Sequence, residues 1–410
     1  MRAWIWIGAL SGCGPPEAAP TDERPRLVWV RGYEGDTWEG SEQGLWWQLT
    51  LLGAAPPQDG SALEVLEESA DRVVLQLDPD LLGLPEAGLE ALQASLEELG
   101  DSDEARVLGG VDLGRALMRS LYDPWRYYAI SGACGTLHDW QTRRRDGPLA
   151  RFAVTDSLLV PGQREITFDL DPSATVRLAY QATEGDGALS DGSFEAQEHE
   201  VLDLMPNGQQ RFAVYDRAGA LLPAATFSAA GQPGRCMWCH EGNMQILSDA
   251  DEAVAGYLSP EQFQQQLDAS EAWMQQVRDA TPSPVPWSDP DVHERGELLV
   301  ETFLYPSPGR LAREWGLGEA AVRAKLSALG LTWHRSDEFP AQGALLDRTE
   351  LDSRMNELIP WVAAQGGRAE PLADGYSPLA VLDSAREVDP ADFAGLDGAA
   401  QGAPYDGCPP

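Results

Sequence analysis

Two cysteines and a histidine lie at a chemically specific spacing in the stretch Cys236-Met237-Trp238-Cys239-His240. Two thiols at this separation can each form a thioether with a vinyl group of haem, while the adjacent imidazole binds the iron from one side of the ring. CxxCH is the attachment signature of c-type haem. With five cysteines and five histidines in 410 residues, composition alone rarely produces this order. We therefore predict one covalent haem c on Cys236 and Cys239, with His240 as an axial iron ligand.

Three other chemistries are open to the same residues. A structural zinc ion needs four protein donors, and the sequence contains no second closely spaced cysteine pair and no HxxxH. A redox-active CxxC usually follows a strand in a βαβ unit, whereas Pro233-Gly234 before the motif and Glu241-Gly242-Asn243 after it are typical of loops. Two inert thiols are the least expected alternative, because such thiols are unusual in an exported protein.

The ligand on the other side of the iron would decide the redox behaviour. A methionine sulfur would raise the reduction potential and suit electron transfer, a second histidine would give a lower potential, and an open site would bind small gases or peroxide. The sequence leaves this sixth ligand unknown. The candidates are Met205, Met244, Met274, His138, His199, His293 and His334.

The first twelve residues have the order of a secretory signal, with a positive charge at Arg2, a short apolar run and then small residues. The sequence LSGC at residues 10–13 resembles the lipobox of bacterial lipoproteins, and that resemblance implies cleavage before Cys13 and acylation of its thiol. The Pro-rich segment 13–24 is typical of a tether. We expect an exported lipoprotein, periplasmic or at the cell surface, that is anchored to the membrane by the acylated Cys13.

The composition is that of an acidic chain with ample material for a core. Hydrophobic residues make up 43% of it, with 14 tryptophans, and the formal net charge is −37. This charge opposes binding to nucleic acid or to anionic lipid. It would suit a basic redox partner protein, although solubility alone is a sufficient reason for it. After the signal, no apolar run approaches the roughly 18 residues that a membrane-spanning helix requires.

Cys134 and Cys408 remain once Cys13 is assigned to lipid and Cys236 and Cys239 to haem. An even pair of cysteines in an oxidising compartment can form a disulfide. A Cys134–Cys408 disulfide is therefore a candidate, and it would require the two Cα atoms to lie about 6 Å apart.

The hydrophobic patterns predict an α+β fold. The N-terminal region combines strands at Arg26–Val30 and Asp71–Leu77 with helices that begin near Pro85 and Asp112. Between residues 151 and 232, apolar and polar residues alternate in short runs separated by turn residues, which predicts an antiparallel meander or sandwich.

Beyond the CxxCH motif the apolar period becomes helical again, and a capping box at Ser259-Pro260-Glu261-Gln262 predicts the start of a helix. The predicted segments are a signal peptide (1–12), a tether (13–24), a mixed, mainly helical domain (25–150), a β domain (151–232), a haem-attachment segment (233–250), a helical domain (251–365) and an acidic, loosely ordered tail (366–410).

An antiparallel sheet that leads into a late CxxCH resembles, in the order of its elements, the cytochrome P460 and c′-beta group. The resemblance covers about residues 150–240. Enzymes of the P460 type cross-link a lysine to the porphyrin. The only lysine of this sequence, Lys325, lies far downstream in a helical pattern, which argues against a P460 activity.

Most of the chain after the tether resembles uncharacterised bacterial exported lipoproteins with a single c-type motif, CMWCH. The phrases that carry this resemblance are Asp112–Arg115, Pro124–Ile130, Arg211–Asp216 and Cys236–Glu241. The resemblance implies a haem lipoprotein and no particular activity.

Together these patterns predict a lipid-anchored monohaem c-type cytochrome at the bacterial cell envelope, and they favour an electron carrier over an enzyme without deciding between the two. One alternative is a haem enzyme or gas-binding protein with an open iron site. A second alternative is an envelope interaction protein whose haem has a structural role.

Overall fold

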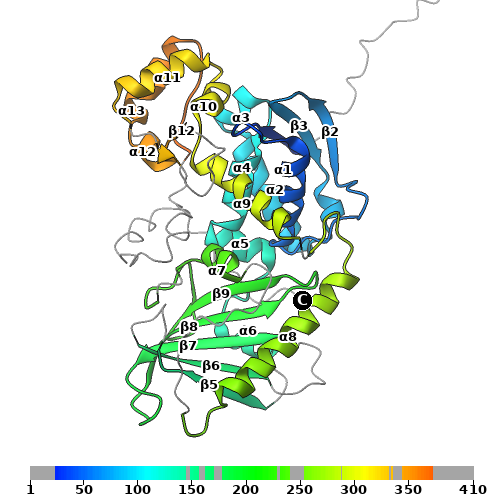
Figure 1. Cartoon of the computed structure of the whole chain (residues 1–410), viewed down its shortest axis with the longest axis vertical. Coiled ribbons are helices and arrows are strands. Elements are labelled where there is room, and N and C mark those ends of the chain that lie inside the picture. Colours follow the sequence, from blue (N-terminus) through cyan, green and yellow to red (C-terminus); the bar gives the residue numbers. More distant parts are fainter. Residues whose placement is uncertain are drawn as a thin grey trace, which may run out of the picture.

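The computed structural model describes residues 24–144, 148–156, 162–169, 178–228, 231–240, 254–287, 289–331, 334–335 and 344–372. Over these residues the protein has an α+β fold, as the sequence predicts, with a four-stranded sheet, a six-stranded sheet, and helices at both ends of the chain. Figure 1 shows the larger sheet at one end of the molecule and the last helices at the other. The signal, the lipobox and most of the tail lie outside the described residues.

The four-stranded sheet has the order β2-β3-β1-β4, in which β1 is antiparallel to β3 and parallel to β4. The predicted strands at Arg26–Val30 and Asp71–Leu77 are confirmed as β1 and β3. The sequence analysis missed β2, whose side chains are almost all exposed, so that no apolar face marks it. The strands are β1 (Arg26–Val30), β2 (Leu63–Glu68), β3 (Arg72–Leu77) and β4 (Val111–Asp112).

Helices cover this sheet and link it to the rest of the chain. The predicted helix start at Asp112 is confirmed, because its carboxylate accepts a hydrogen bond from the Arg115 backbone N–H at 2.9 Å. Helices α1 and α9 cross closely at Gly44 and Gly296, where a Cβ on either glycine would overlap the other helix. The helices are α1 (Trp38–Thr50), α2 (Glu86–Gly100), α3 (Asp103–Leu108), α4 (Leu113–Leu121), α5 (Pro124–Ser131) and α9 (Pro290–Leu304), with a 3₁₀ turn η1 (Pro79–Leu82).

The six-stranded sheet is the predicted antiparallel meander, with the order β10-β9-β8-β7-β6-β5. Helix α8 (Pro260–Ala280) crosses one face, which we call the α8 face, and α6 (Leu137–Arg144) lies on the other (Figure 1). The Ser259 capping box that starts α8 is confirmed. The strands are β5 (Leu149–Val154), β6 (Gln163–Asp169), β7 (Ala179–Asp186), β8 (Glu195–Leu204), β9 (Gln210–Asp216) and β10 (Leu221–Leu222).

Aromatic and polar contacts attach these helices to the sheet. On the α8 face, the ring of Phe263 stacks on that of Phe152 with 4.1 Å between centroids. On the opposite face, the Trp140 indole N–H donates to the Asp203 carboxylate at 2.6 Å. The sheet shares one apolar core with the N-terminal region.

The helices predicted together in 251–365 pack in three different places. Helix α8 lies on the six-stranded sheet and α9 against α1 and α4, while the remaining helices form a separate core. Leu372, which is 2% exposed, packs in the apolar core that the N-terminal region shares with the six-stranded sheet. The last elements are α10 (Pro308–Trp315), α11 (Glu319–Ala328), β11 (His334–Arg335), β12 (Ala344–Leu345), α12 (Arg348–Asp352) and α13 (Met355–Ala364).

Within the described part of the chain, no helix has both the length and the apolar character needed to cross a bilayer.

Candidate haem-attachment site

The CxxCH motif lies in a helix, α7 (Pro233–His240), and the expectation that Pro233-Gly234 forms a loop is wrong. Proline is well tolerated in the first helical turn. Gly234 allows the helix to approach the buried ring of Tyr122, because a Cβ at this position would overlap that ring. Helix α7 also contacts α5 and β9. The motif is therefore held on a short helix at the junction between the N-terminal region and the meander.

The described side chains of α7 divide between core and surface. Met237 is 3% exposed and belongs to the apolar core, whereas Cys236 and His240 are half-buried. Cys236 is a thiol and not part of a disulfide. The imidazole of His240 lies against the ring of Phe212, with 5.7 Å between ring centroids. The backbone of Cys239 is in the same helix, and its side chain lies outside the described residues.

The strand register places the site on the α8 face. Phe212 of β9 is opposite Leu202 of β8, so both point to the same face, which is also the face of Glu200 two residues earlier. The backbone N–H of Phe212 donates to the Tyr127 hydroxyl at 3.2 Å, and that of Val214 donates to the Tyr128 hydroxyl at 3.3 Å. Two buried tyrosines thus complete the hydrogen bonding of the strand next to α7.

The α8 face is incompletely covered between α7 and α8. Ile166, Ala182 and Glu200 lie side by side on three neighbouring strands and are all only half-buried. The neighbouring row on this face, formed by Phe168, Tyr180, Leu202 and Phe212, is buried. This strip is apolar at Ile166 and Ala182, and it lies on the same sheet face as Phe212, which His240 contacts.

An acidic group borders this strip, and we call it the Arg164 cluster. It consists of Arg164 of β6, Glu184 of β7, and Glu198 and Glu200 of β8, and carboxylate oxygens of the three glutamates lie within 4.8 Å of one another. The Arg164 guanidinium forms an ion pair with Glu184 and reaches Glu200 at 3.4 Å. Cys236 lies near enough to contribute electrostatically to the environment of Arg164.

Backbone and hydroxyl groups hold the outer carboxylates of the Arg164 cluster. Glu198 accepts hydrogen bonds from the backbone N–H and the hydroxyl of Thr226, at 2.7 and 3.0 Å. The hydroxyl of Ser228 donates to Glu200 at 2.6 Å. Burial, together with the charge of Glu200, raises the pKa of Glu184 to about 8, against the opposing effect of Arg164.

The structure separates the candidates for the sixth iron ligand. Met274 of α8 shares the α8 face with His240, because its sulfur accepts a hydrogen bond at 3.5 Å from the amide of Gln210, two residues before Phe212. His199 bonds to Gln181 and Thr183 on the opposite face.

The other candidates are elsewhere. His138 is exposed on α6, His293 stacks on Trp47 in α9, and Met205 lies against Gly53. Met244 and the side chain of His334 are outside the described residues. Among the described candidates, only Met274 is on the same face as the motif.

Cys134, at the end of α5, is disulfide-bonded. Its partner is not Cys236. The Cys134–Cys408 disulfide stays a prediction, as does acylation of Cys13.

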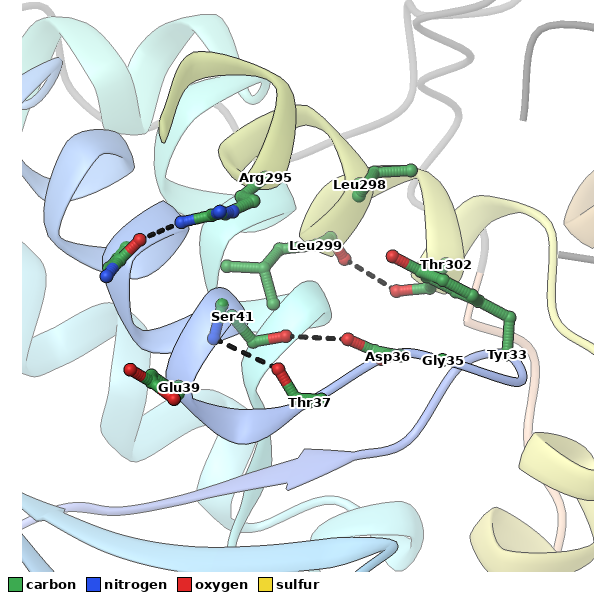
Figure 2. Close-up of a pocket in the computed structure, with 12 residues that line it drawn as sticks. Tyr33, Gly35, Asp36, Thr37, Glu39, Ser41, Arg295, Leu298, Leu299 and Thr302 are labelled. Atoms are coloured by element: carbon green, nitrogen blue, oxygen red, sulfur yellow. Dashed lines mark hydrogen bonds between the residues drawn. The ribbon is translucent and has the colours of Figure 1, made fainter. Parts of the chain in front are cut away.

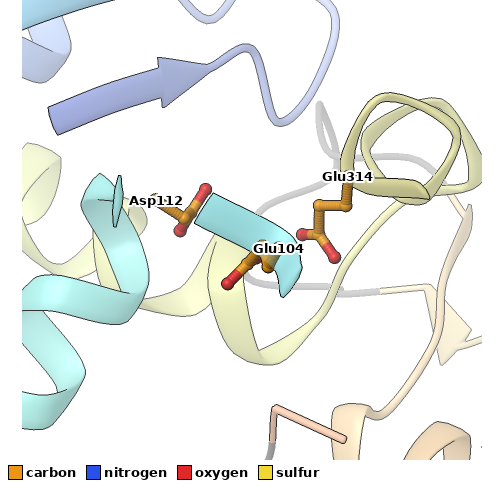
Figure 3. A group of neighbouring side chains, drawn as sticks. All are labelled: Glu104, Asp112 and Glu314. Atoms are coloured by element: carbon orange, nitrogen blue, oxygen red, sulfur yellow. The ribbon is translucent and has the colours of Figure 1, made fainter. Parts of the chain in front are cut away.

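A second acidic group, the Glu104 cluster, joins Glu104, Asp112 and Glu314, and was not foreseen from the sequence (Figure 3). Arg348 donates two hydrogen bonds to Glu314, both at 2.9 Å, and Arg310 forms ion pairs with Asp112 and Glu314. Guanidinium groups thus neutralise most of the cluster, so we assign it a structural role in joining α3 and β4 to α10 and α12. Burial, Glu314 and Asp112 raise the pKa of Glu104 to about 8.

A polar pocket of about 400 Å³ opens between the start of α1 and the side of α9 (Figure 2). Its buried Asp36 accepts hydrogen bonds from the Ser41 hydroxyl and the Gly32 N–H, both at 3.0 Å. Arg295 reaches across it to Gln43, and Tyr33 lies at its other end. No sequence pattern marked these residues, because the pocket forms only where two helices distant in sequence meet.

No known protein family, curated protein or solved structure matches this chain.

Proposed function

We propose that the protein is a lipid-anchored, single-haem c-type cytochrome that carries electrons at the bacterial cell envelope. The observation that supports it most directly is the position of the CxxCH helix. Cys236 and His240 are both half-buried, and His240 lies against Phe212 on a sheet face where Ile166, Ala182 and Glu200 are only partly covered. A structural zinc site or a pair of inert thiols would not explain why part of this sheet face is left uncovered.

Haem bound here would supply an iron that exchanges one electron between its ferric and ferrous states. The residues of the chain have separate roles toward it. Cys236 and Cys239 would hold the porphyrin covalently and His240 would bind the iron, while Phe212, against which the imidazole lies, would help to exclude water. Limited solvent access fits a protein that passes single electrons rather than one that admits substrates.

The position of Met274 supports a carrier over an enzyme. Methionine is a typical second axial ligand of electron-transfer haem, and it leaves no coordination position for a substrate. Met274 is 1% exposed, on the α8 face that it shares with His240. The net charge of −37 and the acylated Cys13 complete the proposal, with a basic redox protein as partner at the membrane.

A second candidate, a haem protein with an open iron site, is favoured by the buried Glu184 beside the same strip. Such an acid could deliver a proton to a bound small molecule. Carbon monoxide separates the two candidates, since it binds ferrous haem only at an open or weakly held position. We expect an unchanged spectrum when carbon monoxide is added to the reduced protein, and a rapid shift would favour the open site.

Covalent haem is the direct test of the proposal. The full chain, produced with a cytochrome c maturation system, should gain the mass of one haem and show c-type bands after reduction. Cys236→Ser with Cys239→Ser should abolish attachment. The matched control, Cys134→Ser with Cys408→Ser, also replaces two cysteines and should keep the haem. Haem that remains covalent in the first double variant, or no haem in the wild-type protein, would overturn the proposal.

Disulfide mapping gives an independent check of the thiols. Peptide mass spectrometry of the unreduced, haem-loaded protein should identify Cys134 joined to Cys408. A Cys134–Cys239 disulfide in that protein would contradict the proposal, because Cys239 could not also hold haem.

A further inference from the structure

The Arg164 cluster carries more negative charge than its one guanidinium can balance. With all three carboxylates ionised, Glu184, Glu198 and Glu200 beside Arg164 leave a net charge of −2. Glu184 is 0% exposed and Glu198 is 1% exposed. Because water screens buried charges poorly, one proton on the cluster removes a large repulsion.

Glu184 is the member of the cluster that is least satisfied as an anion. Among the described residues, its Oε2 atom has no hydrogen-bond partner, whereas Glu198 and Glu200 are bonded to Thr226 and Ser228. A buried carboxylate oxygen without a donor favours the protonated form of the acid. The raised pKa of Glu184 is consistent with this geometry.

The cluster shares a sheet face with the contact of the motif, and Cys236 is close enough to act electrostatically on Arg164. Arg164, Glu184, Glu198 and Glu200 all point to the α8 face, on which His240 contacts Phe212. Glu200 itself belongs to the half-buried strip. The charged groups that act on Glu184 are Arg164 from β6 and Glu198 and Glu200 from β8, while Cys236 from α7 acts on Arg164 and Asp216 of β9 lies opposite Glu198.

We propose that Glu184 is a proton-binding group coupled to the haem. Its carboxylate takes up one proton from solvent when the iron gains one electron, and returns that proton to solvent when the electron leaves. The electron comes from the redox partner or, in a test, from a chemical reductant. This inference rests on the proposed haem function and adds that the protein moves a proton with each electron.

The physical reason is electrostatic. One added electron makes the site more negative by one charge, and in a partly buried site a charge several ångströms away changes the proton affinity of a neighbouring acid. By reciprocity, the proton on Glu184 favours the reduced iron. For one electron and one proton, each tenfold fall in proton concentration lowers the midpoint potential by up to about 59 mV.

The test is a spectroelectrochemical titration of the full-length, haem-loaded protein from about pH 5 to about pH 10, which spans the range around the pKa of Glu184. The wild-type midpoint potential should fall with a slope that approaches about 59 mV per pH unit within this range. Glu184→Gln should make the potential nearly independent of pH. The matched control is Glu165→Gln. Glu165 follows Arg164 on β6, so it points to the opposite face of the sheet, where it accepts a hydrogen bond from the Tyr257 hydroxyl. This variant should keep the wild-type slope.

A second measurement does not depend on the stability of the variant. The infrared difference spectrum of the wild-type protein, reduced minus oxidised, should gain a carbonyl band of a protonated carboxylic acid, and this band should shift in protein labelled with ¹³C-glutamate. A pH-independent wild-type potential, a full slope in Glu184→Gln, or no carboxylic band would overturn the inference and leave the haem proposal standing. Absence of covalent haem would overturn both.

Discussion

Adjacent side chains of the CxxCH motif have opposite environments. Met237 is 3% exposed in the core, while Cys236 and His240 are half-buried beside the meander. A helix turns by about 100° per residue, so consecutive residues face different directions and residues three or four apart share a face. The helical form of the motif thus presents its cysteine and histidine together, while the residue between them anchors α7.

The residue-scale prediction concerns the methionine opposite the motif. Met274→Leu keeps the side-chain volume, so it should cost less than about 1.5 kcal/mol of folding stability. It removes the sulfur that we propose as sixth ligand, so the reduced protein should bind carbon monoxide and its midpoint potential should fall.

The matched control is Met205→Leu, which changes another buried methionine that lies against Gly53, away from the motif. Its spectrum with carbon monoxide should match that of the wild-type protein. Identical spectra for both variants would exclude Met274 as the ligand.

At the scale of elements, the position of α7 depends on the close contact between Gly234 and the ring of Tyr122. Its eight residues are too few to be stable alone, so contacts with Tyr122, α5 and β9 must hold it. Gly234 makes the approach to Tyr122 possible, since any larger side chain would overlap the ring. The position of the motif therefore follows from packing rather than from helix propensity.

Gly234→Ala should destabilise the protein by about 1–3 kcal/mol through overpacking against Tyr122. Helix propensity alone would favour alanine by up to about 1 kcal/mol, so a net loss identifies the contact. Urea denaturation measures the difference. The control is Gly100→Ala at the end of α2, where the added Cβ would meet only Val111 at 4.0 Å, and it should not lose stability. Equal stability of the two variants would show that α7 does not rely on this contact.

For the whole molecule, the Glu104 cluster joins regions more than 200 residues apart in sequence. Arg310 of α10 pairs with Asp112 of β4, and Arg115 pairs with Glu104 and with Glu370 near the end of the described chain. These groups are mostly buried, so removal of one partner would leave an uncompensated charge. The cluster fixes how the C-terminal helices dock on the N-terminal sheet.

The cluster also makes stability depend on pH. The pKa of Glu104 is raised from 4.5 to about 8 by burial, Glu314 and Asp112. Between these values the folded state binds a proton that the unfolded state releases. The contribution of protonated Glu104 to the free energy of unfolding is therefore fully present below about pH 4.5 and is lost as the pH rises through about 8. Over this range the free energy of unfolding falls by at most about 1.4 kcal/mol per pH unit.

Glu104→Gln should remove this contribution and flatten the decline in unfolding free energy between about pH 5 and about pH 8, as measured by urea denaturation across that range. Glu319→Gln, which removes an exposed carboxylate paired with Arg323, is the control and should keep the wild-type decline. A decline in Glu104→Gln as steep as in the wild-type protein would contradict the assignment.

Local signals in the sequence were enough for much of the fold and for the motif. Alternating apolar and polar residues identify the strands of the meander, because a period of two residues places all the apolar side chains of a strand on one face of the sheet. Capping residues such as Asp112 and Ser259 identify helix starts, because the bond that each makes lies within one turn. The chemistry of Cys236, Cys239 and His240 likewise depends on spacing along the chain.

Only the tertiary structure brings together what surrounds the motif. Glu184, Glu198 and Glu200 read as ordinary surface acids in the sequence, and they meet Arg164 because the register of three strands aligns them. In the sequence, Met274 is one of several apolar residues on a predicted helix. In the structure, α8 crosses the sheet face that His240 contacts and places Met274 on it. Burial and long-range register, which no short stretch of sequence encodes, turn these residues into neighbours of the proposed haem.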